Sequence, residues 1–290
     1  MDSLYIPLLA LGAALCFSSG QICSRLGLKY GTPTSATSFS LFTSTVILFV
    51  ALGPFISWEH APPVGLLLFI GAGVLSPFCT QILLFVSATK VGISRASPLR
   101  NTTPLFAGLM AVLVLGETVT VAIATGTLLI IIGASLLGMK DSEAAAPYQP
   151  IYLLLPIMAA FLGGFSSPMR KLGYSMIDSV PLAIWMVQGG GFAALLLYLL
   201  VTGKYRELVF RRETLWWFGL SGVLNSVAVS LNMTALEMGD VVLVSPLIAT
   251  TPLFTVILST VFLRSLERVT LKVLVGAASI CLGGIVLTTF

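Results

Sequence analysis

Long, nearly uncharged apolar runs constrain this chain more than any other feature of its sequence. A helix that crosses a membrane needs about 20 apolar residues, and the runs here have that length, with only short connections between them. Charged residues make up 9% of the chain, whereas a soluble domain carries about a quarter. We therefore predict an all-α membrane protein with ten transmembrane helices, at residues 4–25, 34–57, 64–88, 95–115, 119–139, 150–172, 180–202, 214–236, 241–263 and 269–289.

The sequence also contains an internal repeat. The segment SPLRNTTPLF at 97–106 returns as SPLIATTPLF at 245–254, and the matches continue from Glu117, Thr120, Gly126 and Gly133 to Glu267, Thr270, Gly276 and Gly283. This predicts two five-helix units, 1–139 and 150–290, joined by a linker at 140–149. Because five is an odd number, the second unit must enter the membrane from the opposite face. Inverted repeats of this kind are typical of secondary transporters, which bind substrate near the midplane between the repeats.

These features resemble a known family. Two five-span copies, each with a proline-containing fourth span that runs into a GE-x-x-T turn and a glycine-spaced fifth span, resemble the drug/metabolite transporter superfamily, and above all its ten-helix EamA-type carriers. The turn reads GETVT at 116–120 and, less faithfully, SLERVT at 265–270. The resemblance implies transport of small polar metabolites across the bacterial inner membrane by alternating access. The closest likeness is to amino-acid exporters, including the aromatic amino-acid exporter type.

Two alternatives remain open from the sequence. A sugar, sugar-phosphate or drug carrier belongs to the same superfamily. An integral membrane enzyme acting on lipids belongs to another class of protein, and we disfavour it because no nucleophile, base and orienting group can be assembled from the spans. The one histidine, His60, falls in a predicted loop. We therefore predict a transporter and no enzyme.

Polar side chains within the predicted spans are the candidate substrate-binding residues, because such groups usually face the interior of a helix bundle. They are Ser18, Gln21, Ser76, Thr80, Arg100, Asn101, Ser166, Gln188, Asn225 and Asn232. The alternative for each is a hydrogen bond between helices, worth about 0.6 kcal/mol on average.

Arg100 is the most informative of these residues. A cation inside a span costs about 2.5–3.5 kcal/mol on the insertion scale, and a guanidinium presents a planar fork of donors to a carboxylate or phosphate. The alternative is that its side chain reaches back toward the membrane interface near Arg95. The second repeat has Ile248 and Ala249 where the first has Arg100 and Asn101.

Paired prolines mark the fourth and ninth spans. They are Pro98 and Pro104 in the first repeat and Pro246 and Pro252 in the second. Proline removes a backbone donor and bends a helix, and the hydroxyls of neighbouring threonines can bind the carbonyls that it frees. We predict kinks that serve gating, or alternatively serve packing alone.

The distribution of basic residues predicts an orientation. Of the 15 lysines and arginines, all but Arg170 and Lys171 flank the connections that follow the odd-numbered spans. By the positive-inside rule that side is cytoplasmic, which places both termini outside. Carriers of the family are usually drawn with both termini in the cytoplasm, so the two arguments disagree and both orientations stay open.

The chain lacks several kinds of site. No Asp or Glu lies within a span interior, so we expect downhill transport or exchange and no carboxylate proton relay. The four cysteines, Cys16, Cys23, Cys79 and Cys281, lie in spans without a CxxC pair, which indicates neither a metal nor a disulfide. We expect no cofactor, no nucleic-acid partner and a monomer whose partners are a small-molecule substrate and the lipid bilayer.

Overall fold

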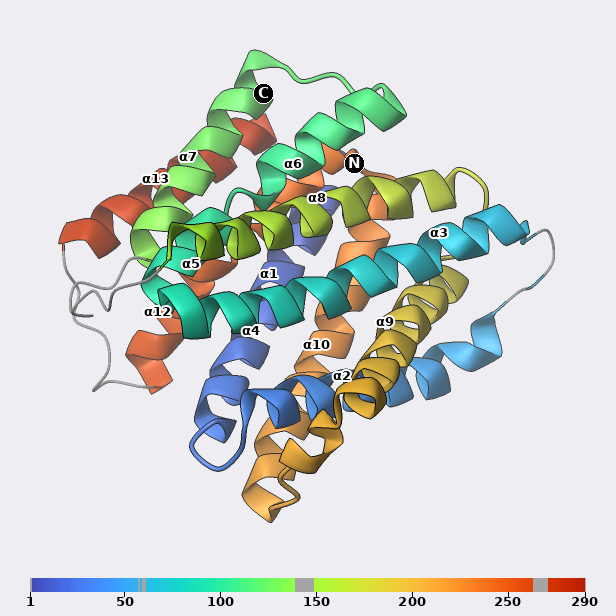
Figure 1. The fold of residues 1–290 in the computed structure, drawn as a ribbon. Coiled ribbons are helices and arrows are strands. Elements are labelled where there is room, and N and C mark those ends of the chain that lie inside the picture. Colours follow the sequence, from blue (N-terminus) through green and yellow to red (C-terminus); the bar gives the residue numbers. More distant parts are fainter. Residues whose placement is uncertain (1, 57, 59–60, 139–148, 263–270, 290) are drawn as a thin grey trace.

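The computed structural model describes residues 2–56, 58, 61–138, 149–262 and 271–289. Within these residues ten helical segments are long and apolar enough to cross a membrane, from Leu4–Gly27 to Leu271–Thr288. Each overlaps one predicted span, so the ten-helix all-α fold is confirmed (Figure 1). The predicted linker and the second GE-x-x-T turn lie largely or wholly outside the described residues.

The helices follow the order of the predicted spans. The first repeat contains α1 (Asp2–Gly27), α2 (Pro33–Leu52), α3 (Pro63–Gly73), α4 (Thr80–Val91), α5 (Ile93–Arg100), α6 (Thr103–Met110) and α7 (Val121–Gly138). The second contains α8 (Leu154–Tyr174), α9 (Val180–Thr202), α10 (Arg212–Met238), α11 (Val241–Ile248), α12 (Thr251–Phe262) and α13 (Leu271–Thr289). Two π-helical segments, η2 (Val74–Cys79) and η3 (Ala111–Leu115), continue the third and fourth spans, and short 3-10 turns lie at η1 (Gly53–Phe55), η4 (Pro150–Leu153) and η5 (Lys204–Glu207).

The fourth and ninth spans each break between their two prolines. Pro104 cannot donate to the carbonyl of Arg100, and the hydroxyl of Thr103 donates to that oxygen instead, at 2.6 Å. In the second repeat the hydroxyl of Thr251 donates in the same way to the carbonyl of Ile248, at 2.6 Å. Threonine thus replaces the lost backbone donor in both repeats, as the sequence predicts.

The fifth and tenth spans show the inverted two-fold relation of the repeats. α7 and α13 lie side by side at the edge of the bundle (Figure 1). A Cβ added to Gly133 would lie 2.5 Å from the carbonyl oxygen of Gly276, and one added to Gly283 would lie 2.6 Å from that of Gly126. Gly126 therefore contacts the counterpart of Gly133, and Gly133 contacts the counterpart of Gly126, in antiparallel order. A two-fold axis requires this reciprocal pattern.

The other eight spans form a ring in which the repeats interleave. α1 packs on α10, and its counterpart in the second repeat, α8, packs on the third span (α3, η2 and α4). Likewise α2 packs on α10, and its counterpart α9 packs on α3. The ring closes through α6 on α8, α12 on α1, α2 on α9, and α11 on α6. The consecutive spans α1 and α2 are thus separated by α10. The repeats therefore do not form two separate bundles, because helices of one repeat pack between helices of the other.

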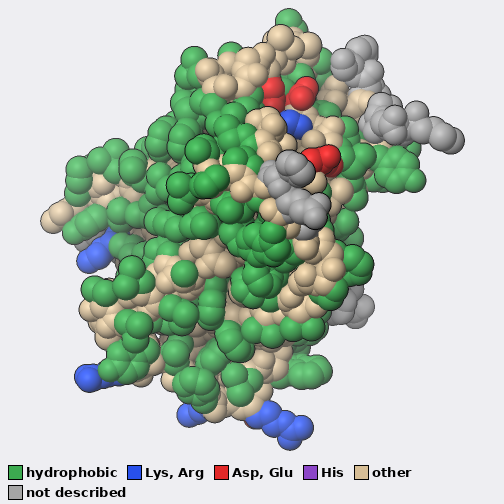
Figure 2. Space-filling model, turned by 90° about the vertical axis from the view of Figure 1, so that its right-hand side faces the viewer, with side chains coloured by type: hydrophobic (Ala, Val, Ile, Leu, Met, Phe, Trp, Pro, Cys, Tyr) green, Lys and Arg blue, Asp and Glu red, His purple; other side chains and the backbone are tan. Residues whose placement is uncertain are grey.

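The two ends of the ring differ in charge and in packing. We call the end with residues 28–32, 92 and 203–211 the basic end, and the end with residues 53–56, 116–120, 175–179 and 239–240 the acidic end. Figure 2 shows acidic side chains gathered near the top of one face, with a basic side chain among them, and other basic side chains toward the bottom and left edges. Two of the three buried apolar clusters, around Val241 and around Phe69, join helices at the acidic end. The third joins α2 and α9, and Phe78 of η2 packs against it. Because most of the buried apolar packing among the described residues lies at the acidic end, we call this the sealed end.

Candidate functional site

Gln21 is exposed on a side of α1 that does not face lipid. The exposed apolar residues of this helix include Leu8 and Leu15. At about 100° per residue, Gln21 lies about 120–140° around the helix from both, and yet its side chain is also exposed. Its accessible surface therefore lies on a different side of α1 from Leu8 and Leu15, in the half of the molecule nearer the basic end.

Asn225 and Asn232 face the interior from α10. Val223 and Val227 mark the lipid-facing side of this helix, and Asn225 lies about 160° around the helix from both. Asn232 lies seven residues, or about 20°, from the line of Asn225. Both asparagines are half-buried, and no hydrogen bond of either side chain occurs among the described residues.

The contact between α1 and α10 places Gln21 beside Asn225. Ser24 and Ser221 share a hydrogen bond of 2.9 Å between their hydroxyls. The two helices are antiparallel, since Gly12 approaches Leu231 whereas Gly27 approaches Phe218. Gln21 and Asn225 lie three and four residues from the serine pair in the same direction, so they differ in level by about 1.5 Å. Two amides that form no side-chain hydrogen bond within the described part of the chain thus lie at about the same depth in the ring.

Arg100 ends α5, just before the break in the fourth span. Its side chain is exposed. It forms no ion pair within the described part of the chain. The Nδ2 atom of the neighbouring Asn101 is buried and has no hydrogen-bond partner. This part of the ring therefore offers a cation and an amide donor whose bonding capacity is unused.

The other predicted site residues are occupied by contacts within the protein. Ser18 is buried and donates to the carbonyl of Leu15, and Thr80 donates to that of Pro77. Ser166 donates to the carbonyl of Ala72 at 3.0 Å, and the amide of Gln188, itself 1% exposed, donates to the hydroxyl of Ser44 at 2.8 Å. The bonds of Ser18 and Thr80 stay within their own spans, whereas those of Ser166 and Gln188 join two helices, so in this conformation all four side chains use their bonding capacity within the protein.

Arg170 is a residue whose role sequence reasoning missed. Ser76 and the cis Ser76–Pro77 bond lie in the π-helical η2, and Pro77 has no amide hydrogen to donate. The guanidinium of Arg170, 8% exposed, donates from Nη2 to the carbonyl of Ser76 at 2.7 Å. Ser76 thus contributes its backbone to a contact between the repeats. The signal in the sequence was a second arginine inside an apolar span, opposite a proline in another.

The three motif residues of the GETVT turn, Gly116, Glu117 and Thr120, have distinct structural roles at the acidic end. Gly116 takes the left-handed conformation (φ 69°) that ends the fourth span. The carboxylate of Glu117 accepts hydrogen bonds from the backbone amides of Val241 and Val242, at 3.0 and 2.9 Å. Thr120 accepts one from the amide of Ile123 at the start of α7. Glu117 therefore caps α11, a helix of the other repeat.

A cavity of about 350 Å³ lies beside this contact. Its lining is polar apart from Leu115 and includes Glu117, Lys171, Tyr174, Ser175, Glu237 and Asp240. The ammonium of Lys171 donates to the carbonyls of Glu237 and Gly239 at 3.0 and 2.9 Å, and so caps the C-terminus of α10. A cation at the C-terminus of one helix and an anion at the N-terminus of another both complement the helix dipoles, so Lys171 stabilises the end of α10 and Glu117 the start of α11.

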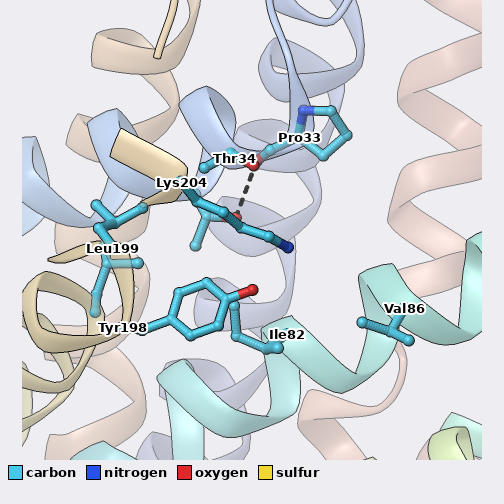
Figure 3. Close-up of a pocket in the computed structure, with 9 residues that line it drawn as sticks. Pro33, Thr34, Ile82, Val86, Tyr198, Leu199 and Lys204 are labelled. Atoms are coloured by element: carbon cyan, nitrogen blue, oxygen red, sulfur yellow. Dashed lines mark hydrogen bonds between the residues drawn. The ribbon is translucent and has the colours of Figure 1, made fainter. Parts of the chain in front are cut away.

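At the basic end a crevice of about 60 Å³ separates α4 from α2 and α9 (Figure 3). Its lining is mostly apolar, with Lys204 above the ring of Tyr198, 5.4 Å from the centroid. The hydrogen bond with Tyr198 raises the pKa of Lys204. Ligand pockets usually measure about 300–1,000 Å³, so this crevice is too small for a metabolite.

Comparison with known proteins places these features in a family. The model of the EamA-like transporter family matches residues 4–139 and 150–290. A solved crystal structure of a protein shares the fold, with a TM-score of 0.78 over 97% of this chain and 95% of that chain, at 17% sequence identity. A search of curated proteins found no match. The family match covers both five-helix repeats, and the chain therefore belongs to the EamA-like transporter family.

Proposed function

We propose that this protein is a secondary transporter that moves small polar metabolites across the bacterial inner membrane by alternating access, with amino acids as its leading substrates and export as its direction. The observation that carries the proposal is a set of accessible polar groups, Gln21, Arg100 and Asn225, whose side chains form no hydrogen bond among the described residues and which lie in the half of the ring nearer the basic end. A guanidinium suits a carboxylate, and amide oxygens can accept hydrogen bonds from an ammonium group.

A sugar-phosphate carrier is the second candidate. The fork of Arg100 fits a phosphate as well as a carboxylate, and the amides of Gln21 and Asn225 can bind sugar hydroxyls. The two candidate substrates differ in charge: an amino acid carries an ammonium group that the site must also bind, whereas a sugar phosphate carries none.

The test is counterflow in proteoliposomes that hold the purified chain. Vesicles loaded with one member of a panel of amino acids, sugars and sugar phosphates should accumulate the labelled form of the same compound. We expect amino acids to exchange. Exchange of sugar phosphates alone would favour the second candidate, and release of a modified lipid without any exchange would favour an enzyme.

Transport should not require a pH gradient. In the described residues the acidic side chains lie at helix ends and turns, such as Glu117, Glu237 and Asp240, and none faces the interior of the ring at mid-depth. Purified carrier should therefore equilibrate labelled substrate between vesicle and medium at equal pH. Uptake that appears only with an imposed proton gradient would contradict this prediction and would direct attention to Glu117 or Asp240.

The basic end should face the cytoplasm, following the charge distribution. A reporter that is active only in the periplasm, fused after Phe290, should then be active, whereas the same reporter inserted after Lys204 should be inactive. With this orientation the unsealed half faces the cytoplasm, where an exporter loads its substrate. An inactive reporter after Phe290 and an active one after Lys204 would instead establish the orientation usual for the family, with both termini in the cytoplasm.

A further inference from the structure

The contact of Glu117 with α11 joins the two repeats at the sealed end of the ring. The carboxylate belongs to the turn after η3 in the first repeat, and the two amides that it binds open α11 in the second. Hydrogen bonds to a charged group are stronger than those between neutral groups, and a carboxylate also complements the positive end of a helix dipole. One carboxylate thus makes two hydrogen bonds between the repeats at that end.

The helix that Glu117 holds forms part of the seal. Val241, Val242, Val244 and Leu247 of α11 are all at most 3% exposed and belong to the apolar cluster that closes the acidic end. The start of α11 cannot leave that cluster without breaking both bonds to Glu117. The bonds and the burial of the valines must therefore be lost together.

The contact can also be broken and remade. The cavity of about 350 Å³ has Glu117 in its wall, and a volume of that size holds several water molecules, since each takes about 30 Å³ in the liquid. Water can then hydrate the carboxylate and the freed amides when they separate. A contact buried on all sides would instead pay the full desolvation penalty of an unpaired charge.

We propose that Glu117 is the clasp that keeps the acidic end closed, and that release of α11 from its carboxylate is the step that opens this end. The proposal rests on the proposed alternating access, because it assigns a residue to one of the two conformational changes. Glu267, which is related to Glu117 by the repeat, lies outside the described residues.

The test measures accessibility and uses no substrate. In a chain whose four cysteines are replaced, Val244→Cys reports on the acidic end and Gln21→Cys on the interior that faces the basic end. Combined with Glu117→Ala, the Val244→Cys reporter should react with a water-soluble maleimide at least about tenfold faster, the factor that 1.4 kcal/mol represents. Labelling of the Gln21→Cys reporter should become slower, because the population shifts from one open state to the other.

Two further variants make the result specific. Glu117→Gln keeps one acceptor oxygen, and its labelling rate should fall between those of the parent and of Glu117→Ala. Asp240→Asn removes a carboxylate from the same cavity at the residue before α11, where the side chain makes no capping bond, and it should leave both labelling rates unchanged.

The outcomes separate the clasp from simpler effects. Faster labelling of both reporters in Glu117→Ala would indicate local unfolding and would overturn the proposal, as would unchanged labelling of Val244→Cys. An equal effect of Asp240→Asn would show that net charge, and not the bond to α11, closes this end. Failure of every compound to cross proteoliposomes would count against the proposed function alone, since the labelling pattern does not depend on transport.

Discussion

Arg100→Leu should fold normally and should weaken substrate binding by about one to two orders of magnitude. Arg100 is exposed within the protein and forms no ion pair among the described residues, so it is free to bind an anionic group of a substrate. A hydrogen bond to a charged group is worth roughly 1.5–3 kcal/mol, and each 1.4 kcal/mol is a factor of ten in affinity. Substrate affinity and exchange rate in proteoliposomes measure the effect, and melting in detergent measures folding separately.

Two matched variants sharpen this prediction. Arg100→Lys keeps the charge but loses the planar fork, so its affinity should fall between those of the parent and of Arg100→Leu. Ile248→Arg, at the repeat-related position, should not restore binding to Arg100→Leu, because the two-fold-related site meets a different part of an asymmetric substrate. A variant Arg100→Leu that folds and transports at the parental rate would identify Arg100 as an interface residue and leave Gln21 and Asn225 as the remaining candidates.

Gly73→Ala should cost so much stability that little folded protein is recovered. Gly73 lies where α3 crosses α9, and a Cβ there would overlap the carbonyl oxygen of Val187 and lie 3.0 Å from the amide nitrogen of Gly191. Both atoms belong to backbone, so no side-chain rotation relieves the contact, and the helices must move apart. Overpacking costs typically about 1–3 kcal/mol, and we expect a loss at or above the upper limit. Thermal melting of the purified variant in detergent measures it.

The control for this prediction is a glycine with free space around it. Gly219 lies within α10, and a Cβ added there would meet no atom within 4 Å. Because alanine favours a helix by roughly 0.5–1 kcal/mol over glycine, Gly219→Ala should keep or raise the melting temperature. A Gly73→Ala variant with the same melting temperature as Gly219→Ala would show that α3 and α9 do not approach as closely as the structure places them.

The sequence by itself determined the number of helices and the relation between the repeats. Apolar length alone specifies a spanning helix, because every backbone polar group in lipid must be satisfied within its own segment. The duplicated spacing of Gly126 and Gly133 likewise survives into the structure as reciprocal contacts with Gly283 and Gly276. These properties depend on local sequence, or on symmetry, and neither requires knowledge of which helices touch.

Only the tertiary structure decided which helices are neighbours and which polar groups remain free. In the sequence, Arg100 and Arg170 are both cations within predicted spans, and Gln21 and Gln188 are both amides within predicted spans. Nothing in the sequence shows which member of each pair finds a partner. In the structure Arg170 binds the carbonyl of Ser76, 94 residues away, and Gln188 binds Ser44, 144 residues away. Hydrogen bonding in a membrane depends on what a neighbouring helix presents at the same depth, and that neighbour is chosen by packing across the ring. Partner choice at such separations is therefore a property of the fold and not of the segment that carries the residue.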